Sequence, residues 1–186
     1  MISLNGRSLR WIAVTEEQEA QAKEIRHKRD GRYSNLYSVS ASDERWVGDL
    51  GEIVFDAWSR GQAGERFTWI LEEAAGKADF ISHAGMSIGV KTVKRKGPPL
   101  MNYEAQISVK HASEPVDQFF FMSYEIALRR MWLLGGIDRI EFGRKARHYR
   151  SGEAVHSHYV IRPGHEIYNI GIRHLNDPWL WMRSVA

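Results

Sequence analysis

Cysteine is absent from this 186-residue chain, and long apolar runs are missing too. The lack of cysteine excludes a disulfide framework and a thiolate zinc site, and it favours a reducing compartment. No stretch approaches the roughly 18 consecutive apolar residues of a transmembrane helix. The N-terminus also lacks the charged and then apolar pattern of a signal peptide. We therefore expect a cytoplasmic protein with no membrane partner.

Signatures of several enzyme classes are also missing. Neither G-x-G-x-x-G nor G-x-x-x-x-G-K-S/T occurs, so no glycine-rich phosphate loop is expected. The G-x-S-x-G pattern of many serine hydrolases is absent as well. No repeat, low-complexity segment or long linker divides the chain. We expect one domain over residues 1–186, with an N-terminal helical arm to about residue 42, a core over about 43–165 and a tail over 166–186.

The composition is that of an ordinary globular domain, with 43% hydrophobic and 26% charged residues. The net charge of +3 and the pI of about 9.2 make the chain mildly basic. This charge is compatible with a nucleic-acid partner but does not require one. Seven tryptophans are many for this length, and any exposed ones are suited to stacking on bases.

Two helices stand out in the N-terminal half. Thr15 and Gln18 have the spacing of a capping box, which predicts a helix from there to about Lys28. Its basic end, which includes Arg26 and Arg29, complements the helix dipole or contacts phosphate. The second helix, over about 43–60, has apolar residues at helical spacing.

The second predicted helix also carries glycines and acids in a regular pattern. Gly48 and Gly51 are poor helix formers one turn apart, and they suggest close approach to another backbone. Asp49, Glu52 and Asp56 project from a neighbouring face of the helix. The acids form either a solvated stripe or, as the glycines favour for Glu52, a carboxylate pressed towards a sheet.

The remaining pattern is mainly that of strands. We expect strands over 66–71, a hairpin over 77–92 that turns at Ala84-Gly85, and further strands over 103–111, 117–124, 130–134, 159–161 and 167–172. Gly135-Gly136 is expected to end one strand, and a short helix is expected over 137–149. The order of these elements predicts a mixed α/β (α+β) domain, with a central mixed β-sheet flanked by helices.

The hairpin carries a candidate hydrolytic site. Asp79 enters its first strand and Lys91 lies in its second, so the two side chains can meet on one face. Phosphodiester hydrolysis needs a divalent cation on the phosphate, an activated water and a neutralised leaving group. Asp79 suits the metal, Glu52 is the natural second carboxylate and Lys91 suits a cationic role. The Val90 carbonyl is a further candidate ligand for Mg²⁺ or Mn²⁺.

The chain resembles the PD-(D/E)XK, restriction-endonuclease-like nuclease superfamily, and most of all its small stand-alone phage and prophage members. The resemblance rests on Gly-Asp-Leu-Gly-Glu at 48–52, Ala-Asp-Phe at 78–80, Ile-Gly-Val-Lys-Thr at 88–92 and the later apolar strand pair. It implies a restriction-endonuclease-like core and a metal-dependent deoxyribonuclease. It also implies metal binding by Glu52, Asp79 and position 89, catalytic assistance by Lys91, and a bacterial or phage-infected cytoplasm.

Two positions depart from the family pattern. Ala78 replaces the proline, which is a mild change, and Gly89 replaces the acid two residues before the lysine. Three outcomes remain open: another carboxylate (Glu52, Asp49 or Glu104) enters the site, metal binding is weakened, or the protein binds nucleic acid without cutting it.

Residues after the hairpin are the candidates for DNA contact, with RNA not excluded. Lys94, Arg95 and Lys96 form a basic loop directly after the lysine strand, and Gln106 lies on the next strand. The basic cluster over 144–150 is a second candidate, with a solvated helix end as the alternative. A nuclease that cuts two strands often acts as a dimer, so a homodimer is an open expectation.

Two histidines offer a competing metal site. His156 and His158 have the spacing of residues on one face of a strand, which suits a transition metal. No third ligand is near them in the sequence.

Overall fold

The computed structural model of the chain describes residues 2–4, 7–33, 45–71 and 77–186. It confirms the mixed α+β class. A seven-stranded sheet has the order β1-β2-β8-β7-β5-β4-β3, with β5 and β7 parallel and the other pairs antiparallel. Its strands are β1 (Ile2–Leu4), β2 (Arg7–Ala13), β3 (Phe67–Trp69), β4 (Phe80–Ser82), β5 (Ser87–Arg95), β7 (Gln118–Glu125) and β8 (Arg130–Asp138). Among the described residues, no helix is long and apolar enough to cross a membrane.

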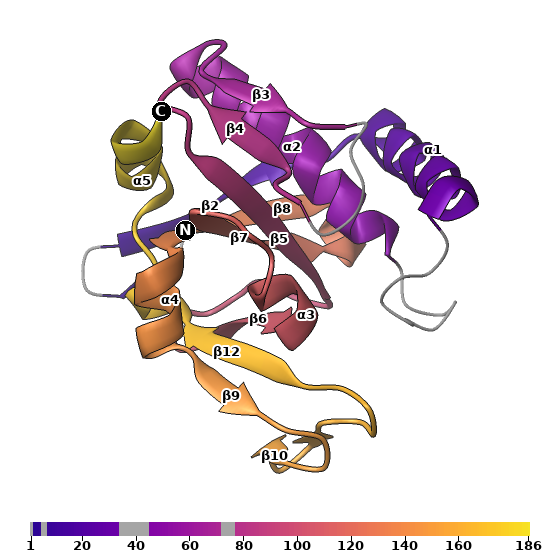
Figure 1. Ribbon diagram of the computed structural model, residues 1–186, viewed down its shortest axis with the longest axis vertical. Helices are drawn as coiled ribbons and strands as arrows, with labels where there is room; N and C mark the ends of the chain where they lie inside the picture. The colour runs from indigo at the N-terminus through magenta and orange to yellow at the C-terminus, as the bar shows by residue number, and fades with distance from the viewer. Residues whose placement is uncertain (1, 5–6, 34–44, 72–76) are drawn as a thin grey trace.

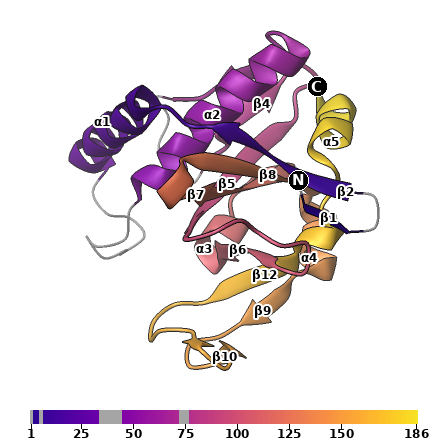
Figure 2. The same ribbon diagram turned by 180° about the vertical axis from the view of Figure 1, so that it is seen from behind.

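Helices cover one face of this sheet, as Figures 1 and 2 show from opposite sides. They are α1 (Glu16–Tyr33), α2 (Trp46–Ala63) and α5 (Pro178–Val185). The predicted capping box of α1 is confirmed, because Thr15 N–H donates to Gln18 Oε1 at 3.0 Å and Gln18 N–H donates to Thr15 Oγ1 at 3.2 Å. The apolar side of α2 packs with α5 and the near face of the sheet in the first hydrophobic core.

The other face of the sheet packs against a smaller layer. This layer contains β6 (Glu104–Ser108), α3 (Val109–Ala112), α4 (Arg139–Lys145), β9 (Arg147–Tyr149) and β12 (Ile167–Gly171). β6, β12 and β9 form a three-stranded antiparallel sheet, and β10 (Ala154–His156) pairs with β11 (Tyr159–Val160). Short 3-10 helices, η1 (Ile126–Leu128) and η2 (Ile172–His174), complete the described chain.

β7 is the central strand, and each of its residues is buried. It lies between β5 and β8, which explains why its sequence is a mostly apolar run rather than an alternating one. The alternation of side chains across the sheet then divides the two cores. Val90 and Phe120 face the α2 side, whereas Gly89 and Phe119 face the smaller layer.

The expectation that Gly135-Gly136 ends a strand is wrong, because β8 continues to Asp138. Gly135 has φ +123°, which suits the irregular register of β8 opposite Phe121 and Met122. A Cβ on Gly136 would lie only 2.4 Å from the Trp181 ring. The two glycines therefore serve a bulge and a close helix approach rather than a break.

Two local predictions also need correction. The helix expected over 137–149 is only α4, since the residues before it belong to β8 and the residues after Ala146 form β9. The strand expected over 103–111 ends at Ser108, where the Ser108 hydroxyl caps α3 by accepting the His111 N–H. A side-chain cap that competes with strand pairing explains the second change.

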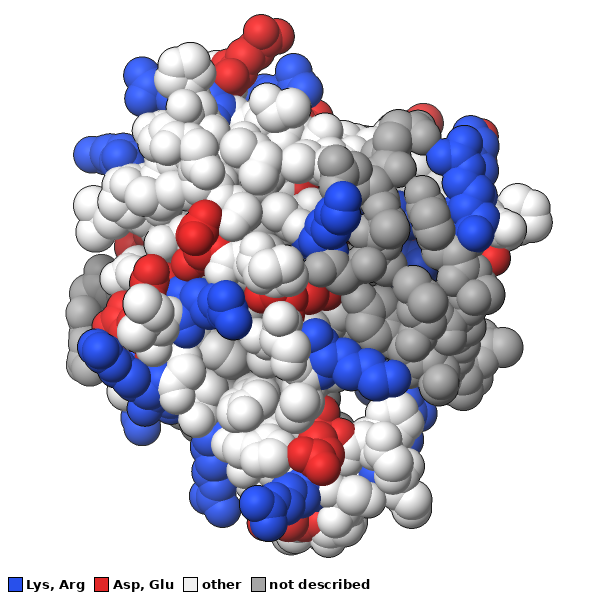
Figure 3. Space-filling model, viewed as in Figure 1, with Lys and Arg blue, Asp and Glu red and all other residues white. Residues whose placement is uncertain are grey.

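Figure 3 shows one face of the molecule with its charges. Lysine and arginine side chains are dispersed over this face, with acidic side chains between them, rather than gathered in one basic stripe. On the face drawn, no single broad surface stands out as a nucleic-acid track.

Candidate functional site

The candidate site lies where β4 separates from β5. The two strands pair at Phe80↔Ile88 and Ile81↔Ser87, and the Asp79 N–H still donates to the Ile88 carbonyl at 2.9 Å. Beyond that point the Asp79 side chain continues the pairing, because its Oδ2 accepts the Val90 N–H at 2.7 Å. The separation of β4 from β5 lets side chains from both faces of the sheet meet around the Asp79 carboxylate.

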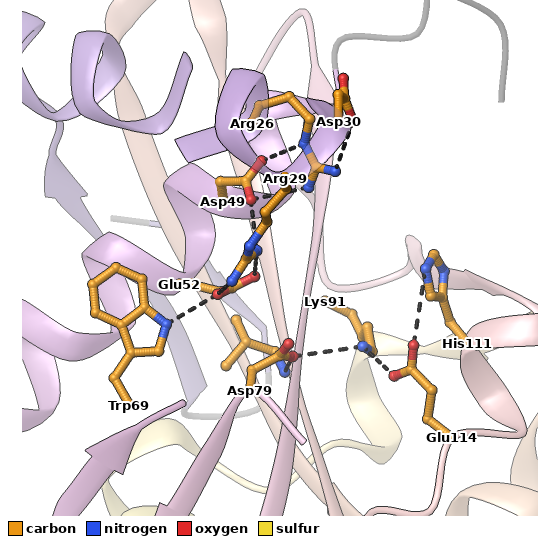
Figure 4. Close-up of polar contacts among 11 residues, drawn as sticks. Arg26, Arg29, Asp30, Asp49, Glu52, Trp69, Asp79, Lys91, His111 and Glu114 are labelled. Carbon is orange, nitrogen blue, oxygen red and sulfur yellow. Dashed lines mark hydrogen bonds and ion pairs between the residues drawn. The ribbon is translucent and has the colours of Figure 1, made fainter. Parts of the chain in front are cut away.

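Lys91 approaches Asp79 from the face of the smaller layer. Its Nζ lies 3.6 Å from Asp79 Oδ2, and its side chain is 11% exposed. The predicted meeting of these two side chains is confirmed (Figure 4). Burial alone would lower the pKa of Lys91, but the neighbouring Asp79 and Glu114 carboxylates outweigh it and raise the pKa. Lys91 therefore remains an ammonium at neutral pH.

Glu114 is the site residue that the sequence did not reveal. Its Oε2 accepts a hydrogen bond from Lys91 Nζ at 2.6 Å, and the residue is only 5% exposed. It comes from the turn after α3, 23 residues beyond Lys91. Because β5 and β7 run parallel, the chain just before β7 returns to the beginning of β5. The position of Glu114 directly before that buried strand is the one sequence signal that could have found it.

Glu52 approaches from the opposite face, on α2. Both of its oxygens are bound by Arg29, with Nη1 to Oε1 at 2.8 Å and Nη2 to Oε2 at 2.9 Å. The Trp69 indole also donates to Glu52 Oε2 at 3.0 Å. Figure 4 shows Glu52 on the α2 side of Asp79 and Lys91 on the other side. The expected inward position of Glu52 is confirmed, and Arg29 is its partner.

Asp49 lies one turn earlier on α2 and is fully buried. Arg26 binds it through two bonds of 2.7 and 2.9 Å, and Arg29 adds a third of 2.6 Å. Burial raises the pKa of Asp49 despite these cations. The basic end of α1 therefore neither simply complements its own dipole nor lies free for phosphate. Two of its arginines are directed at acids of α2.

Gly89 and Val90 of β5 lie next to Lys91 and Asp79. A Cβ on Gly89 would lie 3.2 Å from Lys91 Cε and 3.4 Å from Lys91 Nζ, so this position opens towards the ammonium. The N–H and the carbonyl of one strand residue point to the same strand edge. Since the Val90 N–H faces Asp79, the Val90 carbonyl faces the same edge. The carbonyl is thus placed where the sequence predicted a ligand.

The remaining predicted residues lie elsewhere. Glu104 accepts a bond from Asn169 in the second sheet, so it is not the carboxylate that replaces the missing acid. Gln106 donates to the Tyr159 hydroxyl at 3.3 Å rather than to a group of the site. Arg95 is half-buried, donates to the Glu104 carbonyl and lies over the Tyr103 ring. The predicted basic loop is wrong for Lys94 and Arg95, because these residues are the end of β5 and pair with β7, and Lys96 follows the strand. Lys94 and Lys96 are exposed.

The two remaining competing patterns are resolved differently. His156 and His158 do not share a strand face, because β10 ends at His156 and a turn follows; the His158 N–H donates to His156 Nδ1. The basic cluster over 144–150 is distributed between α4 and β9, where Lys145 binds Glu141 and Arg147 lies over Tyr149. The pair of histidines therefore lacks the geometry that the sequence suggested.

Whether a divalent cation fits next to Asp79 depends on the charges and the donor atoms around this residue. Burial, and then the nearby charges of Glu52 and Glu114, raise the pKa of Asp79 to about 7 although Lys91 opposes the shift. The donors around Asp79 are carboxylate and carbonyl oxygens. Among the described residues no three His, Cys, Asp or Glu side chains converge on one point. Magnesium needs only one or two carboxylates beside water and phosphate, so the donor set fits a hard divalent cation.

No protein-family model matches the chain, and no curated protein matches it.

Proposed function

We propose that this protein is a nuclease of the PD-(D/E)XK type that hydrolyses DNA with Mg²⁺ or Mn²⁺. The observation that carries the proposal is the buried ammonium of Lys91 beside Asp79, at a sheet edge that Glu52 also reaches. An acid and a lysine on paired strands, with a helix glutamate on the other side, suit the metal-binding and charge-neutralising roles of phosphodiester hydrolysis.

In this proposal the chain supplies positions and charge. Asp79, the Val90 carbonyl and Glu52 hold the cation, which when bound polarises the phosphate and lowers the pKa of its water. Glu52 has to exchange the Arg29 guanidinium for this role. Lys91 keeps its proton, so it acts as a fixed cation beside the charge that builds on the phosphate, not as a proton acceptor.

DNA contact is assigned to Lys94 and Lys96, which continue from the lysine strand onto the surface. Arg95, the last residue of β5, lies between them in the sequence and donates to the Glu104 carbonyl. Such phosphate contacts position a duplex without reading its sequence.

Incubation of plasmid DNA with the protein and Mg²⁺ or Mn²⁺ tests the proposal. We expect cleavage that EDTA abolishes and that Lys91→Ala reduces by roughly 100-fold or more. Lys145→Ala is the matched control, because Lys145 is an exposed lysine that pairs with Glu141 of its own helix. Binding of DNA with no cleavage under either metal would sink the nuclease proposal.

A second candidate function is DNA binding without cleavage. The bidentate Arg29–Glu52 pair and the missing acid at Gly89 favour it, because together they leave Asp79 as the carboxylate most open to a cation. A gain of cleavage in Gly89→Glu over an inactive wild type would identify this state.

A further inference from the structure

Gly89 leaves space next to the ammonium of Lys91. A Cβ built on Gly89 would meet the far end of the Lys91 side chain, at 3.2 Å from Cε, and the Phe119 ring at 3.4 Å. An acidic side chain at residue 89 would therefore compete with the present position of the lysine. Glycine at this position lets the Lys91 side chain lie over its own strand.

Glu114 is the carboxylate that meets the lysine there. The distance of 2.6 Å between Glu114 Oε2 and Lys91 Nζ is that of a charge-assisted hydrogen bond, whereas the 3.6 Å to Asp79 is too long for one. Glu114 therefore fixes the location of the ammonium, and Asp79 attracts it only through space. Without Glu114 the ammonium is free to move onto Asp79.

The backbone around Glu114 holds this carboxylate in place. The Glu114 N–H donates to the His111 carbonyl at 3.3 Å, and the Glu114 carbonyl accepts the Val116 N–H at 2.8 Å. The His111 ring adds a contact, with its Nε2 4.0 Å from Glu114 Oε1. Because Glu114 is buried and its backbone is bonded on both sides, its carboxylate is held in place more firmly than that of an exposed surface pair.

We infer that Glu114 is the positioning residue of Lys91, and that it supplies from a distant part of the chain the acidic side chain that residue 89 lacks. Gly89 and Glu114 act as a matched pair, because the space left by one admits the lysine that the other binds. This role rests on the proposed nuclease function.

Removing the carboxylate from residue 114 and then placing one at residue 89 tests the inference. Glu114→Gln keeps the size of the side chain and removes its charge, and we expect kcat to fall roughly 10–100-fold with little change in KM, because the misplaced ammonium acts at the reacting phosphate. The double variant Gly89→Glu with Glu114→Gln returns a carboxylate to the lysine from residue 89. We expect the kcat of the double variant to be roughly tenfold higher than that of Glu114→Gln. The Cβ of the new side chain lies 3.2 Å from Lys91 Cε and 3.4 Å from the Phe119 ring, so the flexible end of Lys91 has to shift to admit it.

Glu65→Gln makes the same chemical change at a carboxylate that is 90% exposed, and it should cleave like the wild type. Urea unfolding of each variant in EDTA checks that the comparison is among folded proteins. If Glu114→Gln is unstable, Glu114→Asp replaces it, and a shortened but charged side chain should lose activity less than the neutral one.

The outcomes separate the two proposals. If the wild type cleaves DNA and Glu114→Gln cleaves it equally fast, the positioning role of Glu114 is overturned and the nuclease function is not. Loss in Glu114→Gln with no recovery in a folded double variant also overturns it, because the residue is then merely structural. A wild type that cleaves under no metal overturns the nuclease function and this role together.

Discussion

Asp79 combines a structural hydrogen bond with a perturbed pKa. It continues the pairing of β4 with β5 by accepting the Val90 N–H, and it faces Lys91. Its partial burial beside two other acids nevertheless favours its neutral form. The same residue therefore joins two strands and carries a charge that burial makes unfavourable.

The pH dependence of stability follows from this shift. The pKa of Asp79 is about 7 in the folded chain and near 3.8 when unfolded, so the native state binds more protons between these values. The contribution of Asp79 is therefore fully present below about pH 4 and is lost as pH rises through 7. We expect wild type to lose stability relative to Asp79→Asn over this window, measured by urea unfolding in EDTA.

The comparison with Asp79→Asn removes the opposite effect of His111. Burial lowers the pKa of His111 to about 4, so its contribution is lost as pH falls from 6.5 towards 4 in both proteins. Parallel stability curves for the two proteins would show that Asp79 titrates normally.

At the scale of elements, α1 is attached to the domain mainly by charge. Ala22 is its fully buried apolar residue and Ile25 is only partly buried, whereas Arg26 and Arg29 bind acids of α2. At the other end, the Tyr124 hydroxyl donates to Glu19. A helix held in this way brings its own cation to Glu52, so its docking and the state of the site are linked.

Arg29→Gln tests this attachment. Loss of the guanidinium leaves Glu52 without its bidentate partner and takes one of three bonds from Asp49, which keeps Arg26. Breaking a buried ion pair costs about 3–5 kcal/mol. Since the Arg29 side chain is 20% exposed, we expect a loss near the lower end, about 3 kcal/mol in urea unfolding. Lys28→Gln on the same helix removes an exposed pair with Glu24 and should leave the free energy of unfolding almost unchanged. Equal effects of both changes would contradict the ionic docking of α1.

The packing of α2 on the sheet depends on one glycine of the pair. A Cβ on Gly51 would lie 1.9 Å from Thr92 Oγ1 and 3.4 Å from Met122 Cε. A Cβ on Gly48 would have no atom of the described residues beyond its own helix within 4 Å. The expected close approach is therefore confirmed at Gly51 and wrong at Gly48. The contact brings the helix that carries Glu52 directly onto the strand that carries Lys91.

The two glycines form a matched experiment on one helix. Gly51→Ala should lower the free energy of unfolding by about 1–3 kcal/mol, because the helix has to move away from Thr92. Gly48→Ala should raise it by about 1 kcal/mol, since alanine is the better helix former. Thermal or urea unfolding measures both, and a destabilising Gly48→Ala would show a contact that the structure lacks.

At the scale of the whole molecule, the two faces of the sheet have different roles. The α2 face holds most of the aromatic core, including Phe55, Phe120 and Trp181. The opposite face carries the smaller layer, which supplies Glu114. The site lies where both layers reach one edge of the sheet, so neither layer alone contains it.

The assignment of DNA contact to Lys94 and Lys96 predicts a modest dependence of DNA binding on salt. If Lys94 and Lys96 contact phosphates, each releases counterions, and each replacement by glutamine should reduce the slope of log K against log salt by about 0.9 on duplex DNA. Fluorescence anisotropy at several salt concentrations measures the slope. Lys110→Gln, at another exposed lysine, is the control, and an unchanged slope in Lys94→Gln with Lys96→Gln would remove this loop from the interface.

Local pattern determined much of this protein from its sequence. The capping box at Thr15, the apolar face of α2, the buried run of β7 and the meeting of Asp79 with Lys91 all depend on neighbours within a few residues or on one hairpin. Periodicity and turn chemistry act over those distances, so the sequence carries them directly.

Tertiary structure alone decided what surrounds the pair. Glu114 reaches Lys91 because β5 and β7 are parallel, and Arg29 reaches Glu52 because α1 docks on α2. Gly136 continues a strand because Trp181 packs over it. Each contact joins residues that are far apart in the chain. The local sequence around one partner therefore carries no information about whether the other partner lies next to it in the fold.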